Sequence, residues 1–183
     1  MRCRHCGEPL KHTFIDLGFA PPSNSYLSIH ELKIPETYYP LVLKVCTNCW
    51  LVQTEDYADA GRLFSSEYAY LSSTSSSWLE HARKFVCSIV AELELSNQDL
   101  VVEIGSNDGY LLKNFLDFGI PCIGIEPTES TARVAEKRGI NVIREFFGSA
   151  LGRRVAHSQG AADLVIGNNV YAHVPDINDF TKG

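Results

Sequence analysis

The sequence lacks both an excess of basic charge and any long apolar run. Lysine and arginine total 16 against 22 for aspartate and glutamate, which gives a formal charge of −6, and no basic cluster stands out. Nucleic acid is therefore not an expected partner. No apolar run approaches the roughly 18 residues that a membrane-spanning helix needs, and the opening MRCRHCGEPL contains no apolar signal region. We expect a cytoplasmic protein with no membrane partner.

Cysteine is sparse, but four of the six cysteines form two Cys-x-x-Cys pairs separated by 39 residues. In a secreted protein these pairs would suggest two disulfides, whereas without a signal region metal binding is the better interpretation. Four thiolates complete a tetrahedral structural zinc site. His5 or His12 is an alternative ligand. The predicted zinc ligands are Cys3, Cys6, Cys46 and Cys49.

The first 60 residues also lack helical periodicity and contain most of the prolines. They predict a small, loop-rich zinc-binding domain with short strands, such as 39–45, where apolar residues alternate. Residues 61–77 form a connecting segment with a serine-rich centre, typical of a linker. From Trp78, apolar residues recur every three or four positions and predict a helix to about Leu95, capped by Ser76 or Ser77.

The remaining sequence alternates between strand and helix patterns, which predicts an α/β fold with an open parallel sheet. If the usual order of such folds holds, the four strands run 3-2-1-4, and the last is left at an open edge. The chain stops at the opening turn of a helix, so we expect a fragment of a longer protein. The predicted strands are 100–105, 121–126, 140–144 and 163–167, and the helices between them are 108–118, 128–138 and 149–157.

The stretch EIGSNDG, residues 103–109, follows the first of these strands but lacks the third glycine of the dinucleotide fingerprint. Its acids, Glu103 and Asp108, repel pyrophosphate and suit a ligand with an ammonium and a sulfonium, such as S-adenosylmethionine. Glu126 ends the next strand, where a carboxylate can accept hydrogen bonds from ribose hydroxyls. The alternative is a tight turn with incidental acids.

The ordered motifs resemble the S-adenosylmethionine-dependent sugar C-methyltransferases of deoxysugar biosynthesis. They include CRHCG, DLGFAPPSN, CTNCWLVQ, EYAYLSSTSSSWLEHA, VVEIGSNDGYLL, GIEPT, EFFG and NNVYAHVPDINDF. The resemblance implies a zinc-binding N-terminal domain followed by a class I methyltransferase (Rossmann-like) core, of which residues 78–183 are the N-terminal half. It also implies methylation of a ring carbon of a nucleotide-linked 4-keto-deoxysugar, through an enolate that a base forms beside the ketone.

The resemblance also implies roles for individual residues. The residues that would contact the methionine side of the cofactor are Glu103, Gly105, Ser106, Asn107, Asp108 and Gly109. Glu126 would bind the ribose, Phe146 or Phe147 would flank the adenine, and Asn168 and Asn169 would lie near the reacting centre. The resemblance also implies that the connecting segment 61–77 lies near the active site, and it makes His173, Tyr68 and Tyr70 the candidate catalytic residues. The segment PPSN (21–24) is a candidate to close over the substrate.

Several of these residues could instead have a purely structural role. The phenylalanines could be core residues, asparagine is common in loops, and His173 could simply structure its loop. For the chain as a whole, the alternatives are a methyltransferase acting on oxygen or nitrogen of another small molecule, or a non-catalytic binding module. The sequence leaves the oligomeric state, the sugar and its nucleotide open.

Overall fold

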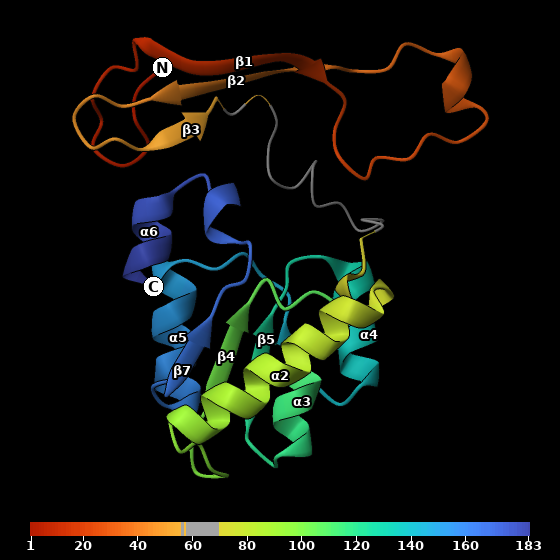
Figure 1. The fold of residues 1–183 in the computed structure, drawn as a ribbon, viewed down its shortest axis with the longest axis vertical. Coiled ribbons are helices and arrows are strands. Elements are labelled where there is room, and N and C mark those ends of the chain that lie inside the picture. The colour runs from red at the N-terminus through yellow and green to blue at the C-terminus, as the bar shows by residue number, and fades with distance from the viewer. Residues whose placement is uncertain (56, 58–69) are drawn as a thin grey trace. The chain divides into compact units, whose positions relative to one another are not determined.

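The computed structural model describes residues 1–55, 57 and 70–183. The chain divides into two compact units (Figure 1). The first consists of Met1–Ser65 with Pro175–Asn178, and the second of Ser66–Val174 with Asp179–Gly183. Each unit has its own sheet, and the two sheets differ in strand direction and in what covers them.

The first unit contains a three-stranded antiparallel sheet in the order β1-β2-β3. Its strands are β1 (His12–Ala20), β2 (Tyr39–Val45) and β3 (Val52–Thr54), and a short 3-10 helix, η1 (Glu31–Lys33), lies between β1 and β2. The predicted strand 39–45 is confirmed as β2. The nine-residue β1 is longer than the short strands expected here, and its register with β2 shifts twice.

Little of the first unit is buried. Among its described residues up to position 57, only Cys3, Cys46 and Gln53 are buried. Two of these three are predicted zinc ligands, so the unit has almost no apolar core of its own. A sheet this small needs a stabilising link other than apolar packing.

The second unit contains a four-stranded parallel sheet in the order β6-β5-β4-β7. This is the predicted order 3-2-1-4, with the last strand at one edge, and the α/β fold class is confirmed. The strands are β4 (Val101–Ile104), β5 (Cys122–Ile125), β6 (Asn141–Ile143) and β7 (Leu164–Ile166). Every residue of β4 and β5 is buried, as expected of central parallel strands covered on both faces.

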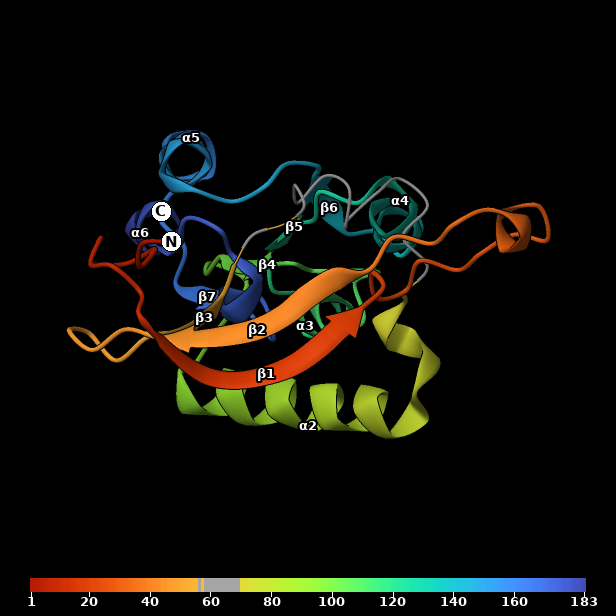
Figure 2. The ribbon, with the colours of Figure 1, turned by 90° about the horizontal axis from the view of Figure 1, so that it is seen from above.

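Helices cover the two faces of this sheet with separate apolar clusters. Val86 of α2 (Ser76–Glu92) and Phe115 of α3 (Leu112–Asp117) pack on one face, and Leu151 of α5 (Ser149–Gln159) packs on the other. Figure 2 shows α2 and α5 on opposite sides of β4 and β5. The remaining helical elements are η2 (Ser72–Thr74), α4 (Glu129–Lys137), η3 (Tyr171–His173) and α6 (Ile177–Lys182).

Two helix starts differ from the prediction. Ser75, rather than Ser76 or Ser77, caps α2, and its side chain accepts a hydrogen bond from the backbone N–H of Trp78. Helix α3 begins at Leu112 instead of Asp108, because the residues before it form a turn in which Asn107 has a φ of 49°. The turn therefore extends further into the predicted helix than the apolar pattern indicated.

In the part of the chain that the structure describes, no helix has both the length and the apolar character to cross a bilayer.

The strand order also locates a natural binding position. Strand β4 is followed along the chain by β5 on one side, whereas the strand on its other side, β7, comes last. In open parallel sheets such a reversal leaves a crevice beyond the carboxyl ends of the strands. The turn 105–109 leaves β4 at this point.

Candidate functional site

The two Cys-x-x-Cys pairs form matching turns. In each turn, the residue after the second cysteine donates its backbone N–H to the carbonyl of the first: Gly7 to Cys3 and Trp50 to Cys46, both at 2.9 Å. These residues also share a positive φ, 78° for Gly7 and 64° for Trp50. Glycine adopts this conformation without strain, whereas tryptophan does not.

The four cysteine sulfurs converge. The Sγ atoms of Cys3 and Cys49 are 3.5 Å apart, as are those of Cys6 and Cys46, and the four sulfurs lie within 4.8 Å of one another. Zn–S bonds of about 2.3 Å place tetrahedral ligands roughly 3.8 Å apart, so this arrangement fits zinc. Among the described residues, no histidine joins the cluster, which leaves His5 and His12 outside the ligand set.

The surroundings of the cluster favour thiolates on its N-terminal pair. Burial raises the pKa of Cys3, but hydrogen bonds from the Cys6 backbone and the Gln53 side chain outweigh it and lower the pKa to about 6. The Gln53 amide nitrogen lies 3.3 Å from the Cys3 sulfur, and its oxygen accepts the backbone N–H of Arg4 at 2.9 Å. Gln53 thus holds the first turn against β3 and orients a ligand sulfur.

The second candidate site surrounds the turn that follows β4. Gly105 and Gly109 have φ values of 68° and 74°, and both positions are closed to a side chain. A Cβ at Gly105 would lie 2.5 Å from Val170 Cγ2, and a Cβ at Gly109 would lie 2.1 Å from Ile140 Cδ1. The two glycines of EIGSNDG are therefore required by the fold of the turn itself, whatever it binds.

Three acids gather at this turn, and all are buried. Glu103, Asp108 and Glu126 are 1%, 0% and 6% exposed. Both carboxylate oxygens of Glu103 and the hydroxyl of Ser106 lack a hydrogen-bond partner among the described residues. Burial, and then the charges of Glu126 and Asp108, raise the pKa of Glu103 well above its usual range. A buried carboxyl group without a partner is costly, and a cationic ligand group would relieve that cost.

Glu126 already has two backbone partners. Its oxygens accept the N–H of Asn107 and the N–H of Thr128, each at 2.9 Å. The carboxylate therefore joins the turn after β4 to the residue that precedes α4. Each oxygen retains acceptor capacity, so a ligand hydroxyl can be added to these bonds.

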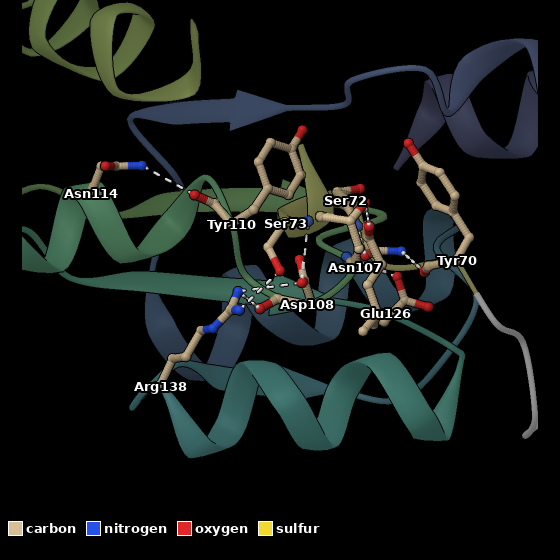
Figure 3. Close-up of polar contacts among 11 residues, drawn as sticks. Tyr70, Ser72, Ser73, Asn107, Asp108, Tyr110, Asn114, Glu126 and Arg138 are labelled. Carbon is tan, nitrogen blue, oxygen red and sulfur yellow. Dashed lines mark hydrogen bonds and ion pairs between the residues drawn. The ribbon is translucent and has the colours of Figure 1, made fainter. Parts of the chain in front are cut away.

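The serine-rich segment contacts the same turn in its described part (Figure 3). The Asn107 side chain donates to the carbonyl of Tyr70 at 3.1 Å and accepts the N–H of Ser72 at 2.9 Å. The N–H of Ser73 lies 3.3 Å from Asp108 Oδ2. Residues 70–73 are thus bound to the glycine turn, as the family resemblance rather than the linker composition would suggest.

The other predicted residues lie in loops at the carboxyl edge of the sheet or just beyond it. Asn168 and Asn169 follow β7 and are exposed, and Asn169 has a φ of 53°. His173 is exposed on η3, Phe146 is exposed after β6, and Tyr70 is 49% exposed. These roles, like those at the turn, stay predictions. Tyr68 and part of the connecting segment lie outside the described residues.

Two features of this region escaped the sequence analysis. Arg138, which ends α4, reaches the turn and segment 70–73, although a basic residue before a glycine suggests only a helix C-terminus. The Trp78 ring stacks on His81, with ring centroids 5.1 Å apart, and lies tilted against Tyr110 at 5.9 Å; these three residues line a small hollow with Asn168. Trp78 was predicted only as an apolar helix residue, because periodicity does not indicate which neighbour an aromatic ring meets.

Comparison with known proteins finds similarity to a zinc-binding family and to a C-methyltransferase. Residues 3–64, which include all four clustered cysteines, match a family described as "Putative zinc binding domain". The chain is 34% identical over 181 residues to the C-methyltransferase NovU of Streptomyces niveus, covering 99% of this chain and 43% of NovU. The resemblance to a C-methyltransferase is confirmed, and this chain spans less than half the length of that relative.

The likeness to a solved structure is weaker than the similarity to NovU. A SAM-dependent methyltransferase from Archaeoglobus fulgidus is 20% identical, with a TM-score of 0.31, over 39% of this chain and 33% of that one.

Proposed function

We propose that this chain supplies the zinc-binding module and the cofactor turn of an enzyme that transfers a methyl group from S-adenosylmethionine to a carbon atom. The acceptor we propose is a nucleotide-linked 4-keto-deoxysugar. The observation that carries the proposal is the buried carboxyl group of Glu103, without a partner among the described residues, beside Asp108 and Glu126 at the turn after β4. The similarity to a C-methyltransferase supports the reaction class.

The charge of the turn separates this proposal from nucleotide binding. A pyrophosphate at this position would face three buried carboxyl groups, and within the turn there is no third glycine to let it approach the backbone. An amino acid ammonium and a sulfonium have the opposite charge. The three carboxyl groups therefore fit S-adenosylmethionine, with Glu103 and Asp108 on its cationic side and Glu126 accepting hydrogen bonds from the ribose hydroxyls.

Each residue has a distinct part in this proposal. S-adenosylmethionine, when bound, supplies an electrophilic methyl group on sulfur. The glycine turn and Glu126 orient the cofactor, and Tyr70 together with Asn168 and Asn169 orients the acceptor at the carboxyl edge of the sheet. His173 is the proposed base that takes the proton from the carbon beside the ketone. The enolate carbon would then form the bond to the methyl group in line, as the methyl–sulfur bond breaks and S-adenosylhomocysteine leaves. Zinc stays structural, because four sulfurs leave no open coordination position.

Calorimetry with the complete gene product tests the cofactor assignment. S-adenosylmethionine should bind, and Glu126→Ala should weaken binding by about 1–3 kcal/mol because a charged acceptor is lost. Glu92→Ala, an exposed acid at the end of α2, is the matched control and should bind normally. Absence of binding at millimolar ligand by the unaltered protein would remove the enzyme proposal and leave a non-catalytic zinc module.

The acceptor needs a separate experiment. The protein is incubated with methyl-labelled S-adenosylmethionine and a panel of nucleotide-linked 4-keto-deoxysugars, and NMR locates the label. A new carbon–carbon bond next to the ketone is the expected product. Label on oxygen or nitrogen would instead favour a different methyltransferase class.

A further inference from the structure

Arg138 connects two parts of the chain that are distant in sequence. It follows the last residue of α4, and its side chain is 31% exposed at the edge of the glycine turn. One terminal nitrogen, Nη1, donates to the backbone carbonyl of Asp108 at 2.6 Å and lies 3.4 Å from Asp108 Oδ2. The other, Nη2, donates to the hydroxyl of Ser73 at 3.0 Å. The planar guanidinium suits this task, because its donors point in fixed directions toward two acceptors at once.

These bonds complete a set that holds segment 70–73 to the turn, shown together in Figure 3. Asn107 binds Tyr70 and Ser72 from one side, and Asp108 with Arg138 binds Ser73 from the other. The same Asn107 is fixed through its own N–H by Glu126. A rigid path therefore runs from the proposed ribose carboxylate to the backbone that carries Tyr70.

We propose that Arg138 is a positioning residue for the acceptor side of the site. By binding Asp108 and Ser73 together, it fixes the segment that carries Tyr70 relative to the turn that carries the cofactor. This inference rests on the proposed function, since it takes Tyr70 to face the acceptor. Arg138 itself touches neither ligand and acts through Ser73 and Asp108.

Arg138 contacts the cofactor turn through Asp108, whereas the bonds that join the rest of the turn to the neighbouring strand do not involve it. Gly105 and Ser106 bind the carbonyl of Ile125 at 2.7 and 3.2 Å, and Asn107 binds Glu126 at 2.9 Å, all without the guanidinium. Removing Arg138 should therefore release segment 70–73 more than it disturbs the turn. A merely structural helix end would instead affect α4 and leave Ser73 unchanged.

The test compares Arg138→Ala, Arg138→Lys and Ser73→Ala in the complete gene product. Arg133→Ala is the control, because Arg133 lies on the same helix and forms an exposed ion pair with Glu129 at 2.7 Å. NMR amide exchange of Ser72 and Ser73 reports on the segment. Calorimetry with S-adenosylhomocysteine reports on the cofactor site, and the acceptor KM and kcat report on positioning.

In Arg138→Ala, we expect amide exchange of Ser72 and Ser73 to rise about tenfold, as for the loss of one charge-assisted hydrogen bond. The acceptor KM should rise by a similar factor, while affinity for S-adenosylhomocysteine changes less than about threefold. Ser73→Ala should give a smaller effect of the same kind. Arg138→Lys should restore only part of the loss, because one ammonium cannot replace both arms of the fork.

Three outcomes would overturn the inference. In a protein that binds S-adenosylhomocysteine, unchanged exchange together with an unchanged acceptor KM would remove the role of Arg138 alone. Faster exchange with no kinetic effect would show that the contact does not position the acceptor. Absence of binding by the unaltered protein would remove both this inference and the proposed function.

Discussion

The two units of this chain are stabilised by different means. In the first, the buried residues among those described up to position 57 are two cysteines of the metal cluster and the glutamine that supports it, while apolar side chains such as Phe19 and Trp50 are 69% and 72% exposed. In the second, two apolar clusters fill both faces of a parallel sheet. The first unit therefore depends on coordination by four sulfurs, whereas the second depends on packing of apolar residues.

Removal of zinc should have the largest effect. Chelation, or Cys46→Ser, should remove structure from the first unit only, because apparent binding free energies of structural zinc reach about 10–16 kcal/mol in small domains. Amide NMR should show collapsed dispersion for residues 1–55, with unchanged signals for β4 and β5. Cys87→Ser is the control: this cysteine lies on α2 and should not alter the zinc content measured by elemental analysis. Retained dispersion without metal would contradict the comparison.

A substitution in the apolar core should destabilise the second unit and leave the zinc site of the first unit intact. Phe115 of α3 is fully buried, and Phe115→Ala should lower the free energy of unfolding of the second unit by about 3–5 kcal/mol through the cavity it leaves. Phe118→Ala, three residues later and 50% exposed, should change it by less than about 0.5 kcal/mol. Denaturant unfolding followed at second-unit amides gives both values. An equal loss of zinc affinity in Phe115→Ala would show that the units are not independent.

Glu103 is a buried acid within the packed unit, and both of its carboxylate oxygens lack a hydrogen-bond partner among the described residues, so a pH series tests it. Its raised pKa means that the folded protein keeps a proton that the unfolded chain releases near pH 4.3, about the ordinary glutamate value. Stability should therefore fall as the pH rises from there toward the folded pKa. Glu103→Gln should remove this fall and add about 1–3 kcal/mol at neutral pH. Unfolding at several pH values measures the difference, and Asp117→Asn, an exposed acid, should leave the slope intact.

The smallest expected effect concerns the strained turn of the first unit. Trp50→Gly should stabilise the zinc-bound form by about 0.5–1 kcal/mol, because a left-handed conformation costs tryptophan more than the extra chain entropy costs glycine. Competition with a zinc chelator would register this as tighter binding of a few fold. Trp50→Ala retains the Cβ and should show no such gain, so an equal gain in both variants would exclude strain as the cause.

The sheet of the second unit could be predicted because its information is local and regular. Strands β4 and β5 consist mostly of apolar residues, and the glycines after α3 and α4 mark the ends of those helices with φ values of 71° and 84°. The strand order then followed from the usual connectivity of such folds. The zinc site could be predicted as readily, because each Cys-x-x-Cys pair forms the same kind of turn and two such turns supply four sulfurs to one metal ion.

What the sequence did not indicate depends on contacts between distant residues. Strand β1 was missed because large side chains such as Phe14 and Leu17 are exposed and Gly18, with a φ of 77°, interrupts the pairing, so the strand has no clean alternation. Segment 70–73 looked like a linker by composition, yet Asn107 and Asp108, about 35 residues later, hold it. No local pattern encodes such bonds, and the family resemblance implied only that this segment approaches the active site.

The placement of the two tryptophans gives the molecule a built-in optical reporter for each unit. The chain contains two, and one lies in each unit: exposed Trp50 follows Cys49, and Trp78 stacks on His81 and lies tilted against Tyr110. Emission from Trp50 should respond to metal at the neighbouring thiolates, whereas emission from Trp78 should respond to the packing of α2 on α3. Single-tryptophan variants would thus follow coordination and core formation as separate signals in one chain.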